Sequence, residues 1–203
     1  MYLYFNKFIN FLILIIVLIV NNYFGDMMLF INLMLFGLFI FLDILNINSS
    51  YIKWFTTLNN FIYSILYLKN SFILKAVFFS LIADYLLLFT DYYILGIIFF
   101  ILVQIQYMKL LSYQSYLPWL FLITIFIDPL TTLALVYLFF SLANLIYCIK
   151  SKNTNMLMVI TLLLCCDIII ALTYLKILPP SLCKFSWLFY FPSQYLLIKK
   201  HSP

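Results

Sequence analysis

Two aspartates lie deep inside long apolar stretches of this chain. Asp84 lies well inside the segment Ser71–Phe89, and Asp167 lies near the centre of the segment Asn155–Leu175. A charged side chain in the middle of a bilayer costs roughly 2.5–3.5 kcal/mol on insertion scales. Two such carboxyls favour a shared polar cavity, in which one group holds a proton while the other stays ionised. That pair has the properties of a general acid working with a carboxylate partner.

A structural role is the alternative for both aspartates. Either carboxyl could join two helices through hydrogen bonds, or could pair with a lysine inside the membrane such as Lys75. The other four acids are closer to segment ends, where a charge is cheap and needs no function; they are Asp26, Asp43, Asp91 and Asp128.

Polar residues at helical spacing point to the same cavity. Side chains three or four residues apart lie on one face of a helix. Three stripes follow this spacing: Gly96, Phe100, Gln104 and Tyr107; Tyr137, Ser141 and Asn144; Ser186, Tyr190 and Gln194. One stripe alone is more often a packing contact than a site, but several stripes together with two aspartates favour a common cavity. The residues expected to orient water or substrate there are Gln104, Tyr107, Asn144, Tyr190 and Gln194.

The composition identifies the solvent around these residues. Of the 203 residues, 67% are hydrophobic and 8% are charged, whereas a soluble domain is nearer half apolar and a quarter charged. A chain this short cannot hide so much apolar surface in one core, so lipid must surround most of it. The net charge of +5 comes from single lysines between apolar segments, which are typical of membrane anchors and not of nucleic-acid binding. The only histidine is His201, which excludes a multi-histidine metal site, and no cofactor is expected.

The apolar pattern predicts an all-α, polytopic transmembrane bundle of about eight spans. A spanning helix needs about 20 apolar residues. Nine apolar segments are visible: Phe8–Phe24, Met27–Asn46, Phe55–Leu68, Ser71–Phe89, Tyr92–Leu111, Tyr116–Ile127, Pro129–Ile149, Asn155–Leu175 and Cys183–Ile198. Tyr116–Ile127 is too short to span alone, so it is expected to merge with the next segment around Pro129 or to dip in and return. If the pair counts as one span, Lys53 and Lys150 share a side and Lys184 lies opposite.

Several short motifs, in order along the chain, resemble the YhhN family of integral membrane proteins, which are the lysoplasmalogenases and their relatives. Phe79–Leu88 is similar to the family helix S-L-x-G-D-x-L-L-L, and Gly96–Tyr107 is similar to its helix with Gly, Phe and His-x-x-Tyr. Cys166-Asp167 stands at the place of a Ser-Asp pair, and Phe189–Tyr195 is similar to the Tyr-Tyr-x-x-Gln helix. Lys53 with Thr56-Thr57 is similar to the Lys-Pro-x-Thr helix start. Residues 53–203 are therefore assigned to a YhhN-like bundle and residues 1–52 to N-terminal transmembrane helices, in one structural domain overall.

The chain departs from the family pattern at four of these positions. Gln104 stands where the family often has His, Ala83 replaces Gly, Cys166 replaces Ser and Trp54 replaces Pro. Glutamine can form hydrogen bonds but cannot titrate, so a proton shuttle at this position is lost.

The resemblance implies a hydrolase of membrane lipids that cleaves the vinyl ether bond of lysoplasmalogens. The products are a fatty aldehyde and a glycerophospho-ethanolamine or glycerophospho-choline. On this reading Asp84 and Asp167 form the catalytic pair, and Lys53 is a candidate headgroup contact if the cavity opens on its side, as are Lys150 and Lys199–Lys200. The resemblance also implies a multi-pass protein of the endoplasmic reticulum or the bacterial plasma membrane. The alternatives are a non-catalytic YhhN-like protein that binds lipid or acts as a scaffold, and a small proton-coupled transporter.

Overall fold

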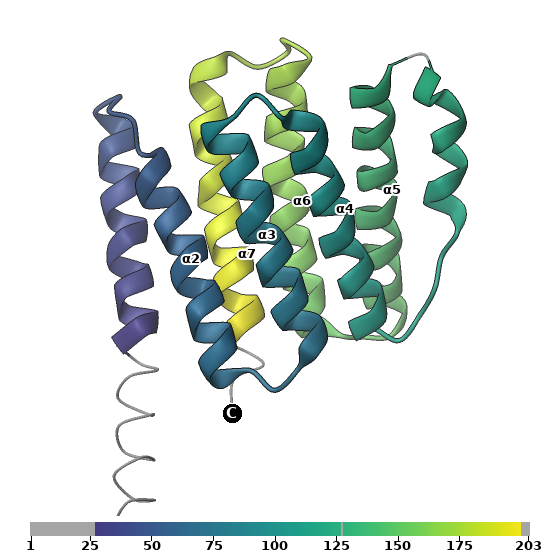
Figure 1. Cartoon of the computed structure of the whole chain (residues 1–203), viewed down its shortest axis with the longest axis horizontal. Helices are drawn as coiled ribbons and strands as arrows, with labels where there is room; N and C mark the ends of the chain where they lie inside the picture. Colours follow the sequence, from purple (N-terminus) through teal and green to yellow (C-terminus); the bar gives the residue numbers. More distant parts are fainter. Residues whose placement is uncertain (1–26, 127, 200–203) are drawn as a thin grey trace, which may run out of the picture.

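The structure, a computed structural model, describes residues 27–126 and 128–199, and every regular element within these two ranges is helical. The helices run up and down in a single bundle (Figure 1). In order they are the helix Met27–Ile44, α2 (Ser50–Tyr67), α3 (Ser71–Phe89), α4 (Tyr93–Leu110), the 3-10 helix η1 (Leu117–Phe126), α5 (Pro129–Lys150), α6 (Thr154–Tyr174), the 3-10 helix η2 (Pro180–Ser186) and α7 (Trp187–Lys199).

Five of these helices are long and apolar enough to cross a membrane. They are Met27–Ile44, α3, α4, α5 and α6. Their length and apolar composition are compatible with an integral membrane protein, and the predicted all-α bundle is confirmed. The expected number of about eight spans is not confirmed, because α2 carries more polar residues and α7 is shorter. The segment Phe8–Phe24 lies outside the described residues.

Side chains at the helix starts explain where several helices begin. Asn70, Asp128 and Asn153 each accept hydrogen bonds from backbone N–H groups in the first turn of α3, α5 and α6, respectively. These N–H groups have no partner within the helix, so a capping side chain stabilises the start. Pro129 occupies the first turn of α5, where a missing N–H costs nothing.

The short segment before Pro129 is a separate element and does not merge with α5. Leu117–Phe126 forms η1, which packs along α5. Asp128, which precedes Pro129, has extended backbone angles, as the clash with a proline ring favours. The chain therefore turns at this point, and η1 and α5 run in opposite directions (Figure 1).

Because the chain passes along the bundle in both η1 and α5, the lysines from Lys150 onward lie at the opposite end from the one expected. The predictions that Lys53 and Lys150 share a side and that Lys184 lies opposite are therefore both wrong. One end, here called the aspartate end, carries the lysines Lys53, Lys176 and Lys184 and the aspartates Asp43, Asp91 and Asp128. The opposite end, here called the lysine-rich end, carries Lys69, Lys75, Lys109, Lys150, Lys152 and Lys199 and none of the aspartates in the described ranges.

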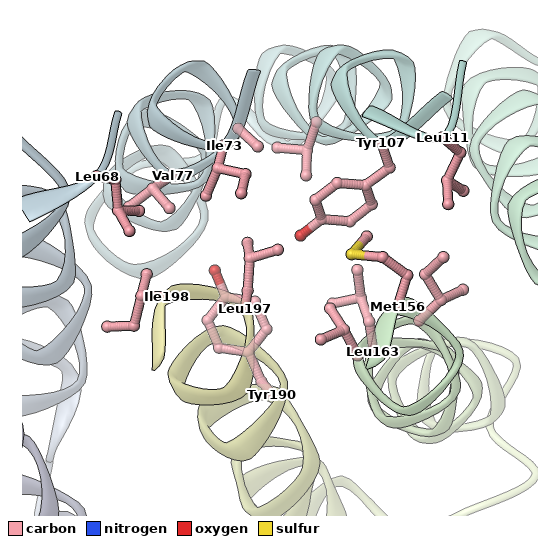
Figure 2. Packing of buried hydrophobic residues seen from close by; sticks show 14 of the residues in the cluster. Leu68, Ile73, Val77, Tyr107, Leu111, Met156, Leu163, Tyr190, Leu197 and Ile198 are labelled. Atoms are coloured by element: carbon pink, nitrogen blue, oxygen red, sulfur yellow. The ribbon is translucent and has the colours of Figure 1, made fainter. Parts of the chain in front are cut away.

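The main core lies between α2, α3, α4, α6 and α7. Tyr107 of α4, Leu163 of α6 and Leu197 of α7 point toward one another there (Figure 2), and all three are at most 1% exposed. A close approach of α3 and α4 is fixed at Gly96, because a Cβ at this position would lie 2.6 Å from Leu87 Cδ2. The core thus packs α3, which carries Asp84, and α6, which carries Asp167, into the same bundle.

Candidate functional site

Asp84 is held by hydroxyl groups from two other helices. The side chain lies on α3 and is 4% exposed. Thr57 Oγ1 on α2 donates to Asp84 Oδ2 at 2.6 Å, and the Tyr190 hydroxyl on α7 donates to the same oxygen at 2.8 Å. Lys75 is exposed on the outer surface of α3, and the described residues contain no ion pair between it and Asp84. The carboxyl is therefore surrounded by neutral donors, and the expected alternative of a Lys75 pair does not occur.

Asp167 ends a chain of hydrogen bonds that crosses α4 and α5. The Tyr137 hydroxyl donates to Asp167 Oδ2 at 2.7 Å, and Gln104 Nε2 donates to the Tyr137 hydroxyl at 3.4 Å. Asn144 Nδ2 donates to Gln104 Oε1 at 2.7 Å, and the Tyr113 hydroxyl donates to Asn144 Oδ1 at 2.5 Å. All four hydrogen bonds donate in the direction of Asp167, so they polarise one another.

The direction of this chain is fixed by a backbone group. Asn144 Nδ2 also donates to the backbone oxygen of Gln104 at 3.1 Å. A carbonyl oxygen can only accept, so the NH₂ group of Asn144 must face Gln104. Burial raises the pKa of Tyr113, which lies between α4 and η1, so its hydroxyl keeps the proton that it donates to Asn144.

The surroundings of the two aspartates meet at Phe100 and Cys166. The Phe100 ring centroid lies 6.2 Å from that of Tyr190 and 6.1 Å from that of Tyr137. The Cys166 side chain is 4% exposed and lies within electrostatic range of both Asp84 and Asp167. The two carboxyls therefore border one buried region.

Tyr107 and Gln194 bring unused hydrogen-bonding capacity into this region. They are 0% and 2% exposed, and the Tyr107 hydroxyl and both amide atoms of Gln194 have no hydrogen-bond partner of normal geometry among the described residues. The Tyr107 hydroxyl lies near the Gln194 amide and within electrostatic range of Asp167 and Tyr190. Leaving a buried polar group unpaired costs about 1–3 kcal/mol. Such groups are able to bind a small polar molecule.

Lys53 is engaged in an ion pair inside the bundle. Its side chain points inward from α2 with 7% exposure, and Nζ lies 2.7 Å from Asp43 Oδ2. Ser49 Oγ donates to the other oxygen of Asp43 at 2.5 Å. Lys53 Nζ also lies 5.7 Å from the Phe39 ring centroid and 5.8 Å from that of Trp187. The charge of Lys53 is thus already balanced, which leaves it little capacity for the headgroup contact expected of it.

Some of the predicted site residues contact an aspartate directly, and others reach one only through a further side chain. Tyr190 contacts Asp84 directly, whereas Gln104 and Asn144 bond to each other and reach Asp167 only through Tyr137. Three donors were missed as site residues: Thr57, Tyr137 and Tyr113. Thr57 and Tyr137 are visible in the sequence as members of a motif and a stripe, but Tyr113 follows the end of α4 and no periodicity identifies it.

Comparisons with known proteins add no relative. No protein-family model matches the chain, and neither does any curated protein or solved structure. Within residues 27–126 and 128–199 there is also no group of three or more His, Cys, Asp or Glu side chains that could hold a metal ion. The fold and the site define a helical bundle, compatible with a membrane protein, that contains two interior carboxyls.

Proposed function

We propose that this chain is a membrane-embedded hydrolase of ether lipids, with the lysoplasmalogenase activity of the YhhN family that its motifs resemble. One observation carries the proposal: Asp84 and Asp167 come from different helices, border the same buried region, and are each bonded by a tyrosine hydroxyl. Two carboxyls in one buried region can act as a general acid and its carboxylate partner.

The cleavage of a vinyl ether requires those two groups. One carboxyl gives its proton to the β-carbon of the vinyl ether, and the α-carbon becomes an oxocarbenium ion. The other carboxylate stabilises this cation or takes a proton from the water that attacks it, as in glycoside hydrolysis. The hemiacetal that forms breaks its bond to the glycerol oxygen, which takes up a proton, and the aldehyde and the alcohol leave.

Neighbouring residues supply the remaining tasks in this proposal. In this proposal the Tyr107 hydroxyl and the Gln194 amide, which have no hydrogen-bond partner of normal geometry among the described residues, orient the attacking water. Gln104 and Asn144 hold Tyr137, which in turn orients Asp167. Gln104 therefore replaces the family's histidine as a positioning residue and not as a proton carrier.

The test is aldehyde release from a lysoplasmalogen by the full-length protein in detergent. Asp84→Asn and Asp167→Asn keep the shape of each side chain, and we expect both to abolish release while the protein still elutes as one folded species. Asp91→Asn is the matched control, because Asp91 is exposed at the aspartate end; its rate should equal that of the parent. Full turnover in both interior variants would rule out the two-carboxyl mechanism.

A non-catalytic lipid-binding role is the second candidate, and the position of Gln104 favours it. This side chain is fully buried between Tyr137 and Asn144 and cannot exchange a proton. A well-folded parent that binds a lysophospholipid and releases no aldehyde would support this role over the enzyme.

A further inference from the structure

A groove opens at the aspartate end between the helix Met27–Ile44 and the η2–α7 segment. Its walls are almost wholly apolar, and two charged residues lie at its mouth; the lining includes Phe39, Asp43, Ile44, Lys184, Phe185 and Leu188. None of these residues belongs to the surroundings of Asp84 or Asp167 described above. The groove is therefore a separate feature of the surface.

Lys184 gives the mouth of the groove a positive charge that is not neutralised. Its Nζ donates to the backbone oxygen of Asp43 at 2.9 Å and to Asn46 Oδ1 at 3.0 Å, and both acceptors are uncharged. The Asp43 carboxylate is taken by Lys53 and Ser49. A lysine ammonium has three donors, so one donor of Lys184 remains for an anionic oxygen.

The depth of the groove matches the boundary between lipid chains and headgroups. Its residues on the first described helix run from Phe39 to Ile44, which are the last turns before the helix ends, so they cover about 8 Å along its axis. Lysines near the ends of spanning helices extend to the headgroup level. A ligand that fits has an anion at that level and an apolar chain that enters the membrane.

We propose that this groove binds a membrane phospholipid, with its phosphate on Lys184 and one chain along Ile40, Ile44 and Leu188. The proposal rests on the proposed function, since it names the place on the surface from which the lipid approaches the same site. The Phe39 ring centroid lies 5.9 Å from that of Trp187, and the Trp187 ring lies 4.8 Å from that of Tyr190, the donor to Asp84. Two aromatic rings thus separate the groove from the candidate carboxyl.

Binding is measured by quenching of Trp187 fluorescence with a lysophosphatidylcholine that carries a brominated, ester-linked chain. The probe has no vinyl ether bond, so the proposed reaction does not consume it. The full-length chain carries Trp54→Phe and Trp119→Phe, so that Trp187 alone reports. We expect Lys184→Gln to weaken binding about tenfold, because a hydrogen bond to a charged group is lost. Glutamine still offers donors to Asp43 and Asn46, so the local contacts are kept.

Lys176→Gln is the matched control, because Lys176 is an exposed lysine at the same end and outside the groove. Its affinity should equal that of the parent. A brominated monoacylglycerol, which lacks the phosphate, should bind the parent about tenfold more weakly and should be unaffected by Lys184→Gln.

Three results would overturn the proposal: equal affinity of the parent and Lys184→Gln, equal binding of the neutral lipid by the parent, or competition by free glycerophosphocholine as strong as that of the lysolipid. The last result would show a site for the headgroup alone. Aldehyde release is measured separately. A chain that binds through Lys184 but releases no aldehyde refutes only the hydrolase proposal, and a chain that releases aldehyde but binds independently of Lys184 refutes only the groove.

Discussion

Asp84 and Asp167 border the same buried region but are supported in different ways. Asp84 receives hydroxyl donors from α2 and α7 on one carboxyl oxygen, and both donors contact it directly. Asp167 receives one hydroxyl, that of Tyr137, which is itself held by a chain of side chains from α4 and α5. Asp84 is almost wholly buried, whereas Asp167 is only partly buried.

The two aspartates differ in how many hydroxyl donors hold each carboxyl. Removal of Thr57 or Tyr190 leaves Asp84 with its second donor, so the direction of the carboxyl is kept. Removal of Tyr137 leaves Asp167 without its donor and leaves Gln104 Nε2 without its acceptor. Members of a buried network depend on one another, and a half-satisfied network is worse than none. Asp167 should therefore be much more sensitive to a single substitution.

The largest expected effect is on turnover. Tyr137→Phe should lower the rate of aldehyde release by about 100-fold and Tyr190→Phe by only about tenfold, on the scale of losing a hydrogen bond to a charged group. Both changes remove one hydroxyl and keep the ring, so they form a matched pair measured under the same conditions. Equal losses in the two variants would show that the second donor to Asp84 gives no protection.

A smaller effect is expected on the stability of the folded bundle. Asn144→Leu removes the partner of both Gln104 Oε1 and the Tyr113 hydroxyl, and should lower the free energy of unfolding by about 2 kcal/mol. Thr57→Val removes one hydroxyl at similar volume and should lower it by about 1 kcal/mol. Unfolding of both variants is followed by circular dichroism in mixed micelles with increasing SDS. A Thr57→Val variant that is less stable than Asn144→Leu would contradict the expectation that the network around Asp167 is the more sensitive of the two.

Much of the fold was predictable from the sequence because apolar length alone defines most elements. The predicted segment Ser71–Phe89 coincides with α3. The predicted bounds of α4 and α6 differ from the observed ones by one residue at both ends, and those of α5 by one residue at one end. The expected merger of Tyr116–Ile127 with the next segment did not occur; it was expected because the segment is too short to span as an α-helix. A 3-10 helix rises about 2.0 Å per residue, so ten residues cover about 20 Å, and length counted for an α-helix misjudges such a segment.

The candidate site was predictable only in part. Asp84 and Asp167 are visible because a carboxyl in an apolar segment is rare, and Tyr190 and Gln194 because they share a helix face. Hydrogen-bond partners are not visible, because Gln104 and Asn144 meet across two helices whose rotation is set by packing. The inward direction of Lys53 could not be predicted either, since it depends on Asp43 of another helix.

Both aspartates lie nearer the same end of the bundle, and this shared position bears on the orientation of the chain in the membrane. Asp84 lies five residues before the end of α3 and Asp167 seven residues before the end of α6, and both helices end at the aspartate end. Lysines favour the cytosolic side of a membrane, and each contributes only about 1 kcal/mol near a charged surface. The lysine-rich end should therefore face the cytosol, which places both carboxyls nearer the opposite face.

Labelling with a membrane-impermeant maleimide in intact cells tests this orientation. Ser181→Cys lies in η2 at the aspartate end and Ser151→Cys directly follows α5 at the lysine-rich end, and both serines are exposed. We expect Ser181→Cys to react in intact cells and Ser151→Cys to react only after permeabilisation, with the parent chain as the control for its own cysteines. The opposite pattern would mean that the lysines do not set the orientation. The groove at Lys184 would then take its lipid from the cytosolic leaflet, because groove and carboxyls lie toward the same end of the bundle.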